Sequence, residues 1–309
     1  DLEQADMYYK KVLEGSYPEN LSELHFKIAM LYKQRGNYDD CYTLLTNECW
    51  TNPPEDMTRA DILCQLIQIF QLTYSVEIGK DAHEKAMSLL NQSQGDTTFV
   101  YILFGWLCHL IVMNTSISEM IHIEEDYPLQ ILSQVTQSHP QNALGWYVYG
   151  RILADSKMNQ PMAVFDAFRQ ALTIDHNNPL HWCSIGNLYY HTEQYGEAIK
   201  AYFKAIALTP QLPEVWFNMG ALYVYHGQKE DAQSSFNRAR DLEPNNPRFN
   251  SIDVEKVQDK PSIIDPSPFE TLPNYTIETY TKPSLPTNIS LQVLTQLQSI
   301  RVPDRKSVV

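Results

Sequence analysis

The chain has 309 residues, 43% of them hydrophobic, and its 23 Lys and Arg against 37 Asp and Glu give a net charge of −14. Such a charge excludes broad electrostatic binding to nucleic acid or anionic lipid, because neutralising phosphates requires clustered Lys and Arg. The acidic excess lies in residues 1–246, with 16 basic and 30 acidic side chains, whereas residues 247–309 hold 7 of each, so the character of the chain changes near residue 247.

A repeated template organises the acidic part, and it is clearest in the last two units. At an offset of 34 residues the following positions match: Trp182 and Trp216, Gly186 and Gly220, Tyr189 and Tyr223, Ala198 and Ala232, Ala205 and Ala239, Pro210 and Pro244. This period and pattern resemble the tetratricopeptide repeat, a pair of packed helices. The Gly allows the second helix to approach closely, and the Pro ends it. We expect both tryptophans to belong to the core.

In chain order, the template predicts a partial unit followed by six complete repeats. Residues 1–21 match only the second helix of a preceding repeat. The complete repeats are expected at about 22–55, 60–93, 98–142, 143–178, 179–212 and 213–246. In the third, the second helix comes 11 residues late, near 128–137. The sequence therefore predicts an all-α fold, a right-handed superhelix of tetratricopeptide repeats (an α-solenoid) with an extended C-terminal tail.

That tail, residues 247–309, holds 8 of the 18 prolines and is expected to be mostly irregular. One stretch has apolar residues at helical spacing and predicts a short helix near 288–300: Ile289, Val293, Leu294, Leu297 and Ile300. This helix either caps the apolar end of the last repeat or folds on a partner. We prefer the cap.

Few residues point to catalysis or metal binding. The five cysteines, an odd and widely spaced number without a Cys-x-x-Cys pair, favour buried reduced thiols. His122 and His191 each stand two positions before a Glu, as in some iron oxygenases, but no strands surround them. The longest apolar run, 99–113, is shorter than the roughly 20 residues of a membrane span. We expect no enzyme, metal, cofactor, small-molecule substrate or membrane contact.

A protein-binding groove remains as the candidate site. In the tetratricopeptide fold, defined positions of each first helix line the concave surface, and the resemblance assigns that role here to Phe26, Met30, Cys64, Gln68, Ile102, Trp106, Tyr147, Arg151, Asn187, Tyr190, Asn218 and Tyr225. The early part is apolar and suits an amphipathic helix. In the later part, three polar residues fall on successive repeats: Arg151, Asn187 and Asn218. Either they form a ladder of donors along an extended peptide, or each is solvated or locally paired; we prefer the second interpretation.

Three sequence strings carry a more specific resemblance: HWCSIGNLYY at 181–190, QYGEAI at 194–199 and EVWFNMGALY at 214–223. They resemble the tetratricopeptide subunit of the fungal-type general transcriptional corepressor, the partner of a WD-repeat corepressor. The Cys and Ser of the first string are not required by the repeat itself. Histone lysine demethylases of the UTX type share this repeat domain. Glu48 and His83 depart from the family at core positions.

The resemblance implies a non-enzymatic corepressor adaptor in the nucleus that links a WD-repeat corepressor to DNA-bound regulators. An amphipathic helix of the WD-repeat partner would lie on Phe26, Met30, Ile102 and Trp106, and other repeats would contact sequence-specific transcription factors. Direct binding to nucleic acid is not expected. Two alternatives stay open: the regulatory repeat domain of a larger chromatin-modifying enzyme, and a generic tetratricopeptide assembly scaffold.

Overall fold

The computed structural model describes residues 21–92, 97–156, 160–244, 246, 249 and 261–269, except for the side chains of 115 and 116. The partial unit predicted over 1–21, apart from Leu21, lies outside these residues. So does the helix predicted near 288–300.

Every regular element within these residues is helical. The helices are α2 (Leu21–Arg35), α3 (Tyr38–Leu44), the π-helical turn η1 (Leu45–Cys49), α4 (Arg59–Thr73), α5 (Val76–Gln92), α6 (Thr98–Met113), α7 (Thr115–Ile121), α8 (Tyr127–Ser138), α9 (Ala143–Asp155), α10 (Pro161–Ile174), α11 (Pro179–His191), α12 (Tyr195–Leu208), α13 (Pro213–Tyr225) and α14 (Lys229–Leu242). The predicted all-α class is confirmed. None of these helices has both the length and the apolar character needed to cross a bilayer.

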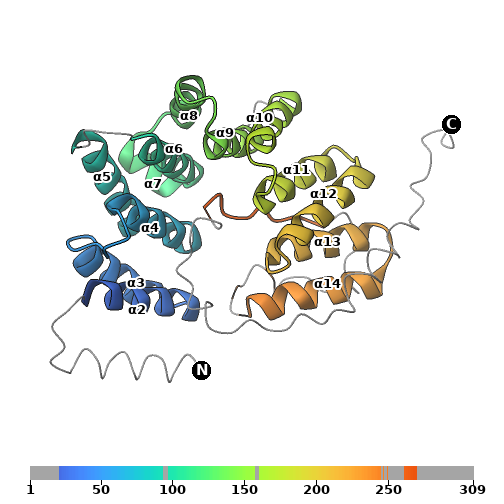
Figure 1. Ribbon diagram of the computed structural model, residues 1–309, viewed down its shortest axis with the longest axis horizontal. Coiled ribbons are helices and arrows are strands. Elements are labelled where there is room, and N and C mark those ends of the chain that lie inside the picture. Colours follow the sequence, from blue (N-terminus) through green and yellow to red (C-terminus); the bar gives the residue numbers. More distant parts are fainter. Residues whose placement is uncertain are drawn as a thin grey trace. The chain divides into compact units, whose positions relative to one another are not determined.

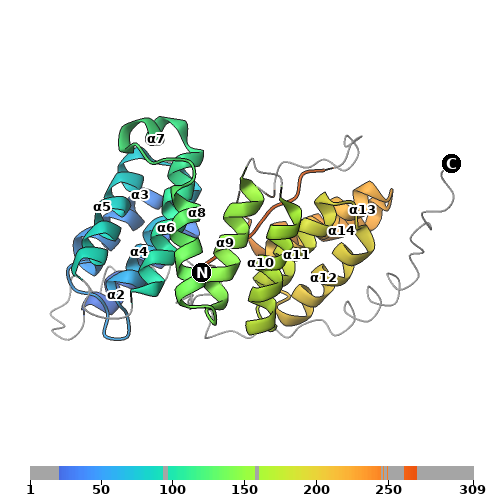
Figure 2. The ribbon, with the colours of Figure 1, turned by 90° about the horizontal axis from the view of Figure 1, so that it is seen from above.

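The helices pack as successive pairs, visible as neighbouring coils in Figures 1 and 2. The pairs are α2 with α3, α4 with α5, α6 with α8, α9 with α10, α11 with α12 and α13 with α14. The first helices of four pairs, α4, α9, α11 and α13, contribute side chains to the groove described below. The insertion before α8 contains α7, which packs on α5 and α6.

Local signals fix where the first helices begin. A capping box joins Thr58 and Asp61 at the start of α4. Asn142 and Asn178 cap α9 and α11 by accepting hydrogen bonds from the amides of Gly145 and Leu180. These caps set where α4, α9 and α11, three of the helices that line the groove, begin.

Close helix pairing depends on glycine at the predicted position. A Cβ added to Gly186 of α11 would lie 2.6 Å from Cε1 of Tyr202 in α12. A Cβ on Gly220 of α13 would lie 2.7 Å from Cε1 of Phe236 in α14. Both distances are shorter than van der Waals contact, so any larger residue forces the aromatic ring to move.

The tryptophans of the template are not core residues, so that prediction is wrong. Trp182 and Trp216 are only half-buried. Their indole N–H groups donate to the carbonyls of His176 and Pro210, each at 2.8 Å, in the loops before their own helices. The indole carries a donor that needs a partner, which favours this position at the junction between repeats over a fully apolar core.

All five cysteines are buried and free, as predicted. Burial raises the pKa of Cys64 and of Cys108 to about 12, so both thiols are protonated at neutral pH.

Candidate peptide-binding groove

An extended segment of the chain, residues 261–269, lies along the first helices of the repeats and belongs to the same compact unit. At one end, the hydroxyl of Tyr190 in α11 donates to the carbonyl of Pro261 at 2.9 Å. At the other end, Nε2 of Gln68 in α4 donates to the carbonyl of Phe269 at 3.2 Å. The segment, orange-red in Figures 1 and 2, therefore runs from later to earlier repeats.

Asn218 of α13 binds both backbone groups of one residue in this segment. Its Oδ1 accepts a hydrogen bond from the amide of Ile264, and its Nδ2 donates to the carbonyl of Ile264, both at 2.7 Å. A peptide backbone without a neighbouring strand exposes these two groups. One side-chain amide satisfies both, and the contact does not involve the Ile264 side chain.

Asn187 of α11 is held in one orientation by four hydrogen bonds. Its Oδ1 accepts from the Tyr202 hydroxyl at 2.7 Å and from Nδ2 of Asn218 at 2.8 Å. Its Nδ2 donates to the carbonyl of Ile264 at 3.2 Å and to Oδ1 of Asp265 at 2.8 Å. These four bonds use the full capacity of the amide, so the network fixes which atom faces the segment.

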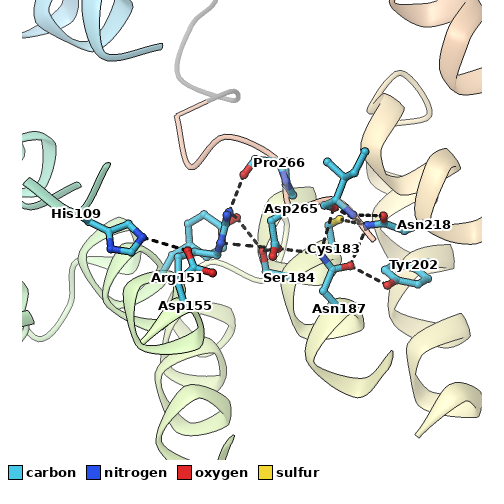
Figure 3. A network of polar contacts seen from close by, with 12 residues as sticks. His109, Arg151, Asp155, Cys183, Ser184, Asn187, Tyr202, Asn218, Asp265 and Pro266 are labelled. Carbon is cyan, nitrogen blue, oxygen red and sulfur yellow. Dashed lines mark hydrogen bonds and ion pairs between the residues drawn. The ribbon is translucent and has the colours of Figure 1, made fainter. Parts of the chain in front are cut away.

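Arg151 of α9 supplies the cation of the groove (Figure 3). Its side chain is buried, its Nη1 donates to the carbonyl of Pro266 at 2.6 Å, and its Nε lies 3.7 Å from Oδ1 of Asp265. The guanidinium also lies over the Trp106 ring, 5.5 Å from its centroid. Burial lowers the pKa of Arg151, but the charges of Asp265 and Asp155 and the interactions with Tyr147 together more than offset this, and the net pKa is raised.

A second carboxylate stands behind the arginine. Oδ2 of Asp155 lies 3.1 Å from Nε2 of His109. Burial raises the pKa of Asp155, yet the His109 hydrogen bond and the Arg151 charge together hold that pKa below its ordinary value. Arg151 thus has one anionic neighbour on the array and a second on the bound segment.

The side chain of Asp265 is the polar anchor of the segment. Oδ1 accepts from Oγ of Ser184 at 3.1 Å in addition to its contacts with Asn187 and Arg151. Four further side chains of the segment are buried: Pro261, Pro266, Pro268 and Phe269. The groove therefore encloses one acidic, three proline and one aromatic side chain as well as the backbone.

Five of the twelve predicted groove residues donate hydrogen bonds to this segment: Gln68, Arg151, Asn187, Tyr190 and Asn218. This is the ladder arrangement, with a segment of the same chain as the occupant. Asn187 is in addition paired with Tyr202 and Asn218 within the array, as the alternative of local pairing expects. That these residues bind a separate partner stays a prediction.

The other seven predicted residues do not donate to the segment in the described contacts. Tyr147 is buried beneath Arg151 and shares a hydrogen bond of 3.0 Å with Ser184. The five apolar early residues are buried at 6% exposure or less: Phe26, Met30, Cys64, Ile102 and Trp106. Tyr225 is 46% exposed, and its ring lies 4.4 Å from that of Tyr195. A partner helix on the early residues stays a prediction, and it requires these side chains to become accessible.

Three residues that contribute to the groove were not predicted from the sequence: Ser184, Tyr202 and Asp265. Ser184 lies three residues before Asn187 on the same helix face, and the repeat does not require a serine there, so that signal was present. Tyr202 is a template aromatic whose hydroxyl orients Asn187, a role the template does not indicate. Asp265 lies in a stretch without periodicity, and no local pattern marked it.

Comparison with known proteins agrees with this geometry. A family model described as TPR repeat matches residues 186–227, and one described as tetratricopeptide repeat matches residues 213–246. Residues 186–246 of this chain therefore contain tetratricopeptide repeats. No curated protein matches its sequence.

Several solved structures of low sequence identity are similar to this chain. The APC/C hetero-tetramer Cut9–Hcn1 matches with a TM-score of 0.51 and 12% identity, over 84% of this chain and 46% of that chain. TTC0263, a thermophilic TPR protein of Thermus thermophilus, matches with a TM-score of 0.49 and 17% identity, over 63% and 94%. Pseudomonas aeruginosa pilF matches with a TM-score of 0.42 and 18% identity, over 76% and 97%. At 12% identity, the match to Cut9–Hcn1 shows the fold alone.

Proposed function

We propose that this protein is a transcriptional corepressor adaptor that acts in the nucleus. Tetratricopeptide repeats are protein–protein interaction scaffolds, and the groove here binds polypeptide backbone through side chains of several repeats. The strings at 181–190 and 214–223 support the corepressor role through their resemblance to the fungal-type family. In this role the scaffold links a WD-repeat corepressor to DNA-bound regulators.

One observation carries the scaffold function: the array holds an extended segment by contacts that suit any extended peptide. Asn218 satisfies the amide and carbonyl of Ile264, and Arg151 donates to the carbonyl of Pro266. Such contacts supply affinity, while a few side-chain contacts supply specificity. A groove built in this way suits short linear segments of regulatory proteins.

The charge of the array is consistent with action through partners. The 16 basic and 30 acidic residues of 1–246 oppose direct contact with DNA phosphates. Among the described residues, no group of three or more His, Cys, Asp and Glu side chains is placed to hold a metal ion. The proposal assigns no reaction to this chain.

Affinity purification of the intact protein from cells, followed by mass spectrometry, tests the proposal. We expect a WD-repeat corepressor and sequence-specific transcription factors among the proteins recovered. The double variant Asn187→Ala, Asn218→Ala should lose the transcription factors, whereas Asn237→Ala, on the exposed face of α14, should retain them.

Two results would contradict the proposal. Recovery without any WD-repeat corepressor would refute the corepressor role and favour a generic assembly scaffold. Equal recovery of transcription factors by the double variant and by Asn237→Ala would refute the groove as their binding site.

A further inference from the structure

The contacts of residues 261–269 are of two kinds. Hydrogen bonds to the backbone are general, because they do not depend on the sequence of the segment, whereas contacts with its side chains are selective. Hydrogen bonds to the backbone involve the carbonyls of Pro261, Ile264, Pro266 and Phe269 and the amide of Ile264. Any extended peptide offers these groups. Selectivity must come from the side chains that the groove contacts.

The selective part is centred on Asp265. Its Oδ1 meets donors from two successive repeats: Ser184 and Asn187 on α11, and Arg151 on α9. A neutral residue here would leave the buried guanidinium of Arg151 without its closest anion, which is costly in a desolvated site. The groove therefore discriminates in favour of an acidic residue at this position.

Proline and phenylalanine complete the pattern downstream. Pro266 and Pro268 are buried, and a proline has no amide hydrogen that would need a partner there. Proline also pre-organises an extended backbone, which lowers the entropic cost of binding. Phe269 is fully buried at the end of the segment beside Gln68. The occupied groove thus fits the pattern Asp-Pro-x-Pro-Phe.

We propose that the groove is a receptor for extended partner peptides of the Asp-Pro-x-Pro-Phe type, and that residues 261–269 occupy it as an intramolecular competitor. The proposal rests on the proposed function only in using the same groove. A partner peptide binds by displacing the chain's own segment. The segment lowers the affinity for every partner peptide by the same factor, so a partner must bind strongly to occupy the groove.

Covalent attachment sets the strength of this competition. Residues 243–260 join the end of α14 to Pro261. A short linker gives an effective concentration on the order of 1 mM. For an isolated peptide that binds with a Kd of about 100 μM, the attached segment then weakens apparent binding by about tenfold. The attached segment therefore weakens the binding of partner peptides but does not prevent it.

Titration of a fluorescent peptide against the full chain tests the inference. The peptide carries residues 259–270, and its binding is followed by fluorescence polarisation. The double variant Asp265→Ala, Phe269→Ala weakens the chain's own segment, and we expect it to bind the peptide about tenfold more tightly than the unmodified chain. Ser262→Ala, at an exposed position of the same segment, should leave the affinity unchanged.

A third variant locates the site of binding. Adding Asn218→Ala to the double variant should weaken peptide binding by about tenfold or more, and replacing the peptide's Asp with Asn should do the same. Circular dichroism verifies that each variant keeps its helical content. These two losses separate binding in the groove from adsorption elsewhere.

Equal peptide affinity of the double variant and the unmodified chain would overturn the intramolecular competition. Absence of peptide binding to every variant would overturn the Asp-Pro-x-Pro-Phe specificity, and partner recovery in the affinity purification would still stand as support for the scaffold. Tight, Asn218-dependent peptide binding without a WD-repeat partner would support this inference and refute the corepressor role.

Discussion

Replacing Asn218 with Ala removes the side chain that binds both backbone groups of Ile264. The amide and the carbonyl of Ile264 each lose a hydrogen bond of 2.7 Å, and Asn187 loses one of the two donors to its Oδ1. Asn218 is fully buried, so the lost contacts were made away from solvent. The variant should therefore loosen the segment 261–269 while leaving the α13–α14 pair assembled.

The size of the effect follows from the two bonds to the segment. A net contribution of about 1 kcal/mol for each neutral hydrogen bond gives a loss of about 2 kcal/mol of docking free energy. At about 1.4 kcal/mol per tenfold change, this corresponds to a roughly 30-fold larger equilibrium population of the open segment. The loss cannot exceed the total free energy that holds the segment in the groove.

Hydrogen exchange resolved at the Ile264 amide measures this opening directly. We expect exchange in Asn218→Ala to be about 30-fold faster than in the unmodified chain. Asn237→Ala removes an exposed amide side chain and serves as the matched control with unchanged exchange. An Ile264 amide that exchanges equally in both variants would refute the assigned contact.

Three further outcomes are expected. Gly186→Ala places a Cβ 2.6 Å from the Tyr202 ring; overpacking should lower stability by about 1–2 kcal/mol, seen as a lower urea midpoint, and an unchanged midpoint would contradict the close approach. Burial lowers the pKa of His181 below its ordinary 6.5, so below pH 6.5 the unfolded chain takes up a proton that the folded chain resists. Stability should fall as the pH is lowered through 6.5, and less so in His181→Gln; an equal fall would contradict this role. Arg151→Met removes the cation facing Asp265 and should make residues 261–269 more sensitive to limited proteolysis, whereas unchanged cleavage would contradict the ion pair.

The groove could be predicted because the repeat fixes which positions of each first helix face inward. Asn187 and Asn218 lie at such positions, and their polar side chains were recognisable as donors. Their ligand could not be predicted, because its bonds join residues separated by 46 to 201 positions. The segment itself has no helical or strand period, so no local signal indicated that it docks.

Other differences between the predictions from the sequence and the structure have local causes. The indole N–H of Trp182 donates to a loop carbonyl and holds the ring at the junction between repeats. A pattern of apolar residues does not predict this position, because it takes no account of the indole donor. The early groove residues such as Phe26 and Ile102 were recognised as apolar, but their burial depends on packing that the positions alone do not specify. Helical spacing identifies a face, and the tertiary neighbours decide whether it is open.

Photo-crosslinking from position 269 tests most directly whether the array holds its own extended segment. Phe269 is replaced by benzoylphenylalanine in the full chain, and the products within single molecules are mapped by mass spectrometry. The account predicts crosslinks to α4 near Gln68, because Gln68 donates to the carbonyl of the fully buried Phe269. Crosslinks confined to other parts of the chain, or formed only between molecules, would contradict it.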